Sequence, residues 1–146
     1  MSVLVCFQNA VVMGRKTWFS IPEKFRPLPK RINIVLSREL PEAPEGTHLA
    51  HSFTEAMRML NEGPLGSSVE SVFVIGGSSV YAEAMMSGEF PCRLYMTRIL
   101  GDFTCDTFLL SVDDYKFRKV PNPDDIPVET LHENGIDFKF EVYEKD

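Results

Sequence analysis

A chain of 146 residues, 44% hydrophobic and 25% charged, is long enough to form one folded domain with a core of its own. This composition excludes an intrinsically disordered protein, and a formal net charge of −6 argues against a protein that coats nucleic acid. The apolar segment Val3–Phe7 is too short for a signal peptide or a membrane span, and three widely spaced cysteines, Cys6, Cys92 and Cys105, indicate reduced thiols in a cytoplasmic protein.

The N-terminal part of the chain alternates expected strands and helices. Asn9–Met13 is expected to be a strand, and Thr17–Ile21 a short helix that Pro22 ends, because proline cannot continue the hydrogen-bond ladder. Arg31–Leu36 is rich in β-branched residues and is expected to be the next strand.

A longer helix is expected to begin after Ser52, which forms a capping box with Glu55. Its buried face repeats at helical spacing through Phe53, Ala56, Met57 and Leu60.

The C-terminal half continues with a strand at Val72–Ile75, a helix at Ser79–Met86 and a strand at Arg93–Ile99. The alternation over Phe138–Tyr143 predicts a half-buried strand, and Asn134-Gly135 predicts a hairpin turn before it. The chain is therefore expected to be an α/β protein with a mostly parallel sheet, flanking helices and a C-terminal antiparallel hairpin.

The turn at Gly76-Gly77 is the most informative local motif. It follows a buried strand and is followed by the hydroxyl residues Ser78 and Ser79 and then by the expected helix. Such a turn exposes backbone N–H groups that can bind phosphate. A plain strand-to-helix connection is an equally good interpretation of this segment alone.

Two other turns have similar chemistry. In Met13–Trp18, a glycine permits the turn, two basic residues supply charge and Thr17 can cap a helix. The P-loop motif is excluded, because Asn9 stands where that motif needs glycine. Ser37-Arg38 follows the next strand and suits a phosphate monoester, although such a pair is more often plain surface.

These turns, taken together, predict a dinucleotide lying across several strand ends, without the Gly-x-Gly-x-x-Gly fingerprint of an ordinary Rossmann domain. Met13–Arg38 carries a formal charge of about +6 within a chain of net charge −6, which suits a polyanionic ligand drawn to one face. A solvated basic surface is the alternative.

At the level of these motifs the chain resembles the dihydrofolate reductase family, in its animal form. The resemblance runs from about Gln8 to the C-terminus, in one order and over a single domain. The segments that carry it are Val11–Pro22, Arg31–Arg38, Val74–Tyr81, Thr97–Ile99 and Phe138–Lys145.

The resemblance implies an oxidoreductase that reduces 7,8-dihydrofolate to tetrahydrofolate with NADPH in one-carbon metabolism. It implies a cis peptide between Gly76 and Gly77, and it places the 2′-phosphate and adenosine end of NADPH at Ser37 and Arg38. It implies no metal. The implied cofactor-binding residues are Gly14, Arg15, Lys16, Thr17, Ser37, Arg38, His51, Ile75, Gly76, Gly77, Ser78, Ser79 and Tyr81.

For the folate substrate, the resemblance implies an apolar wall and one charged contact. Arg31 would pair with the α-carboxylate of the glutamate tail, and Thr97 would support the pterin end. His51 departs from the family, where an arginine often helps to hold the adenosine end. The apolar wall consists of Ile21, Pro22 and Leu28.

The N-terminal segment departs most from the family, which begins with a central strand, a glycine-containing loop, a Trp and a helix that bears an acid. Residues 1–22 contain no Asp or Glu, so no catalytic acid is identified. We expect Val3–Met13 to be one long strand or a frayed extension. The expected gap lies between the strands Val72–Ile75 and Arg93–Ile99.

Two alternatives follow from this departure. The chain would be a shortened form of low or no activity that only binds NADPH or folate, or it would depend on a partner chain. Members of the family are expected to be monomers, but an open sheet permits self-association.

Overall fold

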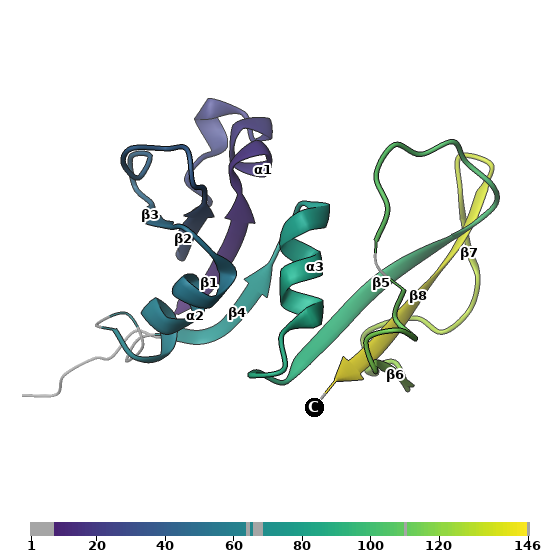
Figure 1. The fold of residues 1–146 in the computed structure, drawn as a ribbon. Helices are drawn as coiled ribbons and strands as arrows, with labels where there is room; N and C mark the ends of the chain where they lie inside the picture. The colour runs from purple at the N-terminus through teal and green to yellow at the C-terminus, as the bar shows by residue number, and fades with distance from the viewer. Residues whose placement is uncertain (1–7, 64, 66–68, 110, 146) are drawn as a thin grey trace, which may run out of the picture. The chain divides into compact units, whose positions relative to one another are not determined.

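The computed structural model describes residues 8–63, 65, 69–109 and 111–145 (Figure 1). The chain forms two compact units, Met1–Ala84 and Met85–Asp146. Each unit contains one sheet with its own strand order.

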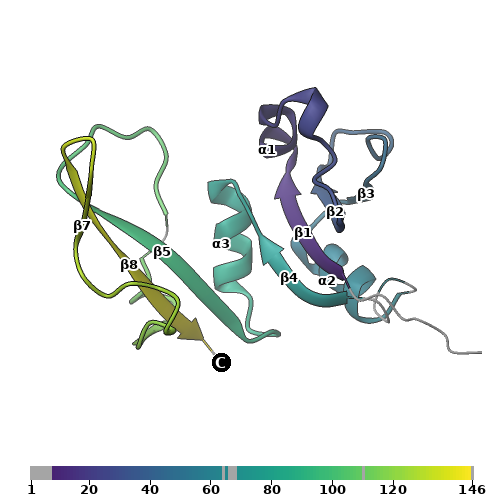
Figure 2. The same ribbon diagram turned by 180° about the vertical axis from the view of Figure 1, so that it is seen from behind.

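The first unit contains a four-stranded sheet in the order β3-β2-β1-β4, in which all neighbouring strands are parallel (Figures 1 and 2). Its central strand is buried from Ala10 to Met13, each at most 3% exposed, as expected for a parallel strand covered on both faces. The strands are β1 (Gln8–Gly14), β2 (Arg31–Leu36), β3 (His48–Ala50) and β4 (Val69–Val74).

The expected helices are present, with one corrected start. Gly14 is the N-cap of α1, so the helix begins at Arg15 and not at Thr17, and the expectation that Thr17 caps it is wrong. Gly14 has an extended cap conformation and makes no side-chain cap hydrogen bond. The helical segments are α1 (Arg15–Ser20), the 3-10 turn η1 (Glu23–Phe25), α2 (Phe53–Asn61) and α3 (Ser78–Met86), whose last two residues belong to the second unit.

Helix α2 confirms the expected buried face and the Ser52 N-cap, while the Glu55 side chain bonds one residue before the N-cap that the capping box requires. The Ser52 side chain accepts a hydrogen bond from the Glu55 N–H at 3.1 Å, and the Glu55 carboxylate accepts from the His51 N–H at 2.9 Å. The four residues expected on its buried face, Phe53, Ala56, Met57 and Leu60, are each no more than 8% exposed.

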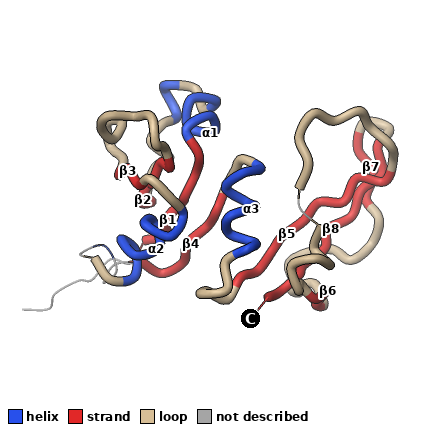
Figure 3. Tube along the Cα trace, in the orientation of Figure 1, coloured by secondary structure: helices blue, strands red, loops and turns tan. Residues whose placement is uncertain are grey.

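The second unit is an antiparallel sheet in the order β5-β8-β6, with β7 also paired to β8 (Figure 3). The hairpin between β7 and β8 turns at Asn134 and Gly135, which have φ values of 51° and 76°, and this confirms the predicted turn. The hydrophobic core of the second unit contains Met85, Phe117 and Tyr143. The strands are β5 (Cys92–Leu100), β6 (Arg118–Val120), β7 (Leu131–Glu133) and β8 (Ile136–Lys145).

The predicted α/β class is therefore confirmed, with the parallel and antiparallel parts in separate sheets. Among the described residues, β4 pairs only with β1 and β5 only with β8. Strand β1 begins at Gln8, and the expectation for Val3–Phe7 lies outside the described residues. No helix in the described part of the chain is long and apolar enough to cross a membrane.

Candidate functional site

The predicted turns of the first unit gather at one edge of its parallel sheet. The register places Gly14 beside Leu36 and Leu36 beside Ala50, so the residues that follow, Arg15, Ser37 and His51, leave neighbouring strands at the same edge. The carboxyl ends of parallel strands are where open α/β sheets bind ligands.

Two glycine turns at this edge are joined by backbone hydrogen bonds. The Gly14 N–H donates to the Gly76 carbonyl oxygen at 2.8 Å, and the Ile75 N–H donates to the Val12 carbonyl oxygen at 3.0 Å. A Cβ added to Gly14 would lie only 3.3 Å from the Val80 Cγ2 atom. The close packing of Gly14 against helix α3 therefore leaves little room for a side chain at this position.

Gly76 lies at the centre of this candidate site, between the Gly14 turn and the Thr17 and Tyr81 hydroxyl groups. It is buried and has a φ of +124°, a conformation that side chains disfavour. The peptide between Gly76 and Gly77 is cis, as the resemblance implied. A Cβ added to Gly76 would lie 3.4 Å from the Thr17 Oγ1 atom and 3.6 Å from the Tyr81 hydroxyl oxygen. Two hydroxyl groups therefore flank bare backbone here.

Ser37 is held so that its hydroxyl can still donate a hydrogen bond. The backbone N–H groups of Glu39 and Leu40 both donate to Ser37 Oγ, each at 3.1 Å. These two bonds occupy the acceptor positions of the hydroxyl and leave its hydrogen available. His51 Nδ1 lies 3.1 Å from the Ser37 carbonyl oxygen, which can only accept, so Nδ1 carries the hydrogen.

The basic side chains at this edge are accessible. Lys16 and Arg38 are exposed, and Arg15 is half-buried and pairs with Glu39 at 3.1 Å. Glu39 is 74% exposed, so this ion pair is of the surface kind, which contributes little to stability and can exchange for an anionic ligand. Ser78 and Tyr81 are half-buried and Ser79 is exposed.

The rest of the basic stretch lies elsewhere, so the expectation of one basic face is only partly correct. Arg31 and Lys30 lie at the amino end of β2, opposite to the end that carries Arg38. The Arg26 guanidinium stacks 5.4 Å from the ring centres of Trp18 and Phe19. The basic residues of Met13–Arg38 are therefore distributed over both ends of the sheet, and Arg26 among them is used in packing against aromatic rings.

The apolar residues predicted to hold substrate lie together. Ile21 and Leu28 pack against the buried cluster that contains Trp18, and Ile75 packs against the same cluster. Pro22 is exposed beside them.

Sequence reasoning missed two residues that fix this region. The Arg26 Nη1 atom donates to the carbonyl oxygens of Trp18 and Ile21, at 3.3 and 3.2 Å. Asn33 is 2% exposed, and its side chain donates to the carbonyl oxygens of Leu28 and Arg31 and accepts from the Leu28 N–H. A polar residue inside an apolar strand was the available signal for Asn33.

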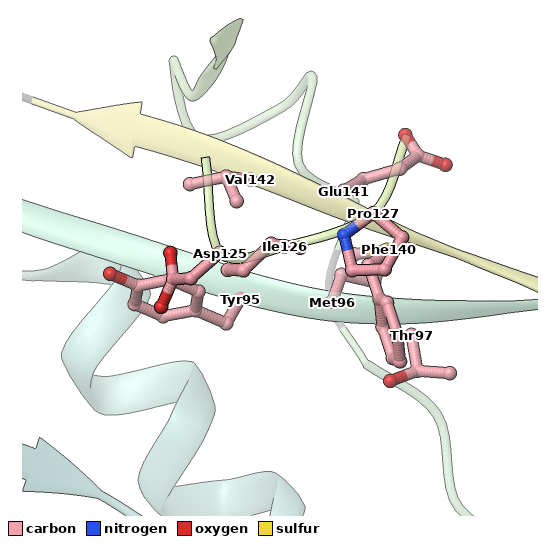
Figure 4. Close-up of a pocket in the computed structure, with 9 residues that line it drawn as sticks. All are labelled: Tyr95, Met96, Thr97, Asp125, Ile126, Pro127, Phe140, Glu141 and Val142. Atoms are coloured by element: carbon pink, nitrogen blue, oxygen red, sulfur yellow. The ribbon is translucent and has the colours of Figure 1, made fainter. Parts of the chain in front are cut away.

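Thr97 lies in β5 of the second unit. It lines a hollow of about 300 Å³ together with Tyr95, Phe140 and the loop residues Asp125–Pro127 (Figure 4). Figure 4 shows the Glu141 carboxylate turned away from the Thr97 side chain.

Glu141 is the buried carboxylate of the described chain, at 5% exposure. The Tyr143 hydroxyl donates to it at 2.6 Å, the Arg98 guanidinium contacts it, and the Lys119 Nζ atom lies 3.5 Å away. The hydrogen bond from Tyr143, with the help of Arg98, lowers the pKa of Glu141 to about 2. Glu141 is therefore ionised at neutral pH.

The fold and this edge define an α/β protein with a candidate ligand site at the carboxyl edge of a parallel sheet. The family model for dihydrofolate reductase matches residues 5–145. Among curated relatives, dihydrofolate reductase of Mus musculus is 53% identical over 94% of this chain and 74% of its own length. That of Bos taurus is 50% identical over 95% of this chain and 74% of its own length.

A solved structure agrees with these sequence relatives. The structure of Schistosoma mansoni dihydrofolate reductase matches with a TM-score of 0.80 and 47% identity, over 94% of this chain and 75% of that chain. The chain belongs to the dihydrofolate reductase family. It spans about three quarters of the length of these relatives.

Proposed function

We propose that this chain binds NADPH along the carboxyl edge of its first sheet and uses it to reduce 7,8-dihydrofolate to tetrahydrofolate. The observation that carries the cofactor site is the bare backbone of Gly76, which lies beside the Thr17 and Tyr81 hydroxyl groups and is bonded to the Gly14 turn. When bound, NADPH supplies the hydride for the reduction.

The residues at this edge fit the charges of NADPH. The pyrophosphate would lie over the turns Gly14–Thr17 and Gly76–Ser79, where N–H groups, hydroxyls and basic side chains meet. The 2′-phosphate would accept a hydrogen bond from the Ser37 hydroxyl and form an ion pair with the guanidinium of Arg38. His51 would lie at the adenosine end, since its ring is fixed on the Ser37 carbonyl.

The substrate contacts are proposed from the packing around Trp18. Ile21, Pro22 and Leu28 would contact the aromatic middle of the folate, and Arg31 would bind its glutamate carboxylate. Arg31 is exposed, and its Nε atom is held at 3.0 Å from the Pro29 carbonyl oxygen. Thr97 would support the pterin end. These side chains orient the substrate, and orientation is a large part of catalysis.

Proton delivery is a separate question from binding. Of the carboxylates in the described chain, the buried one is Glu141, and its pKa of about 2 makes it a poor proton donor at neutral pH. Binding and turnover are therefore best measured separately.

The test begins with fluorescence titration of the whole chain with NADPH and with NADH. NADPH should bind more tightly than NADH, and Arg38→Gln should remove most of this difference. Arg31→Gln is the matched control, because it removes the same charge at the opposite end of β2. Equal affinity for the two cofactors would contradict the placement of the 2′-phosphate.

The second measurement is the oxidation of NADPH in the presence of dihydrofolate. Turnover establishes the reductase activity. Tight, selective NADPH binding without turnover would retain the cofactor site and reject the reaction for this chain.

A further inference from the structure

The turn that follows β2 is held by contacts on both sides of Glu39. The Ser37 N–H donates to the Ala50 carbonyl oxygen at 3.0 Å, and the Ser37 carbonyl oxygen lies 3.1 Å from His51 Nδ1. The N–H groups of Glu39 and Leu40 both donate to Ser37 Oγ, and Leu40 packs against a buried hydrophobic cluster of the first unit. The backbone that carries the Glu39 side chain is therefore fixed.

From this fixed backbone the Glu39 side chain reaches the neighbouring turn. Its Oε2 atom lies 3.1 Å from the Arg15 Nη2 atom. Arg15 is the first residue of α1, directly after the N-cap Gly14. The ion pair therefore places a negative charge on one of the basic side chains proposed to meet the phosphates of the cofactor.

Two other acids near this edge are engaged by backbone groups instead. The Glu55 carboxylate accepts a hydrogen bond from the His51 N–H at 2.9 Å, and the Glu83 carboxylate accepts one from the Phe53 N–H at 3.2 Å. Such contacts are expected at the start of α2, because the first N–H groups of a helix have no partner within it. Glu39 differs from both acids because its partner is a basic side chain that a phosphate group could bind.

We propose that Glu39 is an internal competitor of the cofactor, which holds the Arg15 guanidinium until a phosphate group displaces it. This inference rests on the proposed NADPH site. Arginine binds carboxylate and phosphate through the same forked N–H donors, so the two anions compete for it and also repel each other. Glu39 is part of the same chain as Arg15, so its carboxylate has a high effective concentration.

The exposure of the pair sets the size of the effect. The Arg15 side chain is 38% exposed and that of Glu39 is 74% exposed, and ion pairs of this kind are weak. Glu39 should therefore reduce NADPH affinity by only a few-fold. The bonds that fix the turn use the backbone of Glu39 and not its side chain, so Glu39→Gln should fold as the parent chain does.

The test is fluorescence titration of the full chain with NADPH. Glu39→Gln should tighten NADPH binding about two- to fivefold, because Arg15 no longer has to leave a carboxylate. Glu42→Gln is the matched control: Glu42 is exposed, lies further along the same loop and loses the same charge, but no ion pair joins it to a described residue. This control should change NADPH affinity little. Circular dichroism checks that both variants fold.

A double-mutant cycle tests whether Glu39 acts through Arg15. Arg15→Gln alone should weaken NADPH binding, and adding Glu39→Gln to it should give no gain, because the side chain for which the two anions compete is then absent. The gain in the parent background should also shrink as salt is raised toward 1 M, where the screening length is about 3 Å.

The outcomes separate this inference from the cofactor site itself. Unchanged or weaker NADPH binding by Glu39→Gln, an equal gain in Glu42→Gln, or a gain that persists beside Arg15→Gln would each overturn the proposal. If the parent chain binds NADPH and one of these results is found, the inference about Glu39 fails alone. If the parent chain does not bind NADPH, the proposed cofactor site fails and this inference fails with it.

Discussion

Gly76 is the residue of the candidate cofactor site whose backbone conformation is least compatible with a side chain. We predict that Gly76→Ala costs about 1–3 kcal/mol of stability, because alanine at a φ of +124° is strained. The new methyl group would lie 3.4 Å from Thr17 Oγ1, which is ordinary contact, so strain and not a clash sets this cost. The same methyl group would cover the bare backbone, so NADPH affinity should fall as well.

The measurements are urea unfolding followed by Trp18 fluorescence and an NADPH titration. Trp18 is the single tryptophan and lies in the first unit, so it reports on that unit. Gly77→Ala is the matched control for strain, because Gly77 lies in the same turn and unit, has no positive φ, and a Cβ there would meet only Thr17 Oγ1, at 3.9 Å. If Gly76→Ala binds NADPH as the parent chain does, the turn is not part of the cofactor site.

Asn33 controls the loop that carries Leu28 and Arg31. We predict that Asn33→Leu lowers the stability of the first unit by about 1–3 kcal/mol, since the N–H and C=O groups of half-buried Leu28 lose their partner. Folate affinity should fall more than NADPH affinity, because Ser37 and Gly76 are not touched by Asn33. Trp18 fluorescence in urea measures the first effect, and separate titrations measure the second.

Asn61→Leu provides the comparison for this variant. Asn61 is exposed, and within the described part of the chain its side chain donates to the Met57 carbonyl oxygen of its own helix. Its replacement should change stability little. An equal loss in the two variants would show that the Asn33 bonds have no special role.

Between elements, the contact of β5 with β8 depends on Glu141. The folded chain lowers the pKa of this carboxyl from 4.5 to about 2, so ionised Glu141 stabilises the second unit above about pH 4.5. This stabilisation is lost as the pH falls from 4.5 toward 2. We predict that Glu141→Gln lowers the hydrogen-exchange protection of β5 and β8 at neutral pH, and that the difference from the parent chain shrinks over this range.

Glu144→Gln tests whether burial is the reason. Glu144 also pairs across the sheet, with Arg93 and Arg118, but its side chain is 27% exposed and Glu141 is 5% exposed. More exposed ion pairs contribute less, so this variant should have the smaller effect. A constant difference between Glu141→Gln and the parent chain at every pH would contradict the role given to its charge.

The sequence predicted well those elements whose start or turn is marked by characteristic neighbouring residues. Helix α2 follows from a capping box and apolar residues at helical spacing, and the β7–β8 turn follows from Asn134-Gly135. The start of α1 was misplaced, because a glycine N-cap leaves no side-chain signal. The strands β3 and β6 were missed, since three residues show no periodicity.

The candidate site was predictable where its residues follow strand ends. The turns at Gly14, Ser37 and Gly76 were found in this way, and the parallel sheet brings them to one edge. The contacts of Arg26 and Asn33 were not predictable, because each side chain binds backbone groups whose position depends on how the loop folds. The distribution of the basic residues of Met13–Arg38 over both ends of the sheet was not predictable for the same reason, because it also depends on how the loop folds.

On the scale of the whole molecule, the two units have separate sheets, and the proposed cofactor residues belong to the first. A ligand that binds only folded protein stabilises it by about 2.7 kcal/mol at one hundred times its dissociation constant. We therefore predict that NADPH slows hydrogen exchange in β1, β2, β4 and the turns at their carboxyl ends. Exchange in the β5–β8 ladder should not change, because no proposed cofactor contact lies there.

Arg38→Gln, measured at the same NADPH concentration, is the internal control for this experiment. It should reduce the added protection of the first unit and leave the second unit as it is in the parent chain. Protection that rises equally in both units would mean that NADPH stabilises the chain as one cooperative body, and the cofactor could then not be assigned to the first sheet by this measurement. Protection confined to β5 and β8 would place the cofactor in the second unit and reject the site at Gly76.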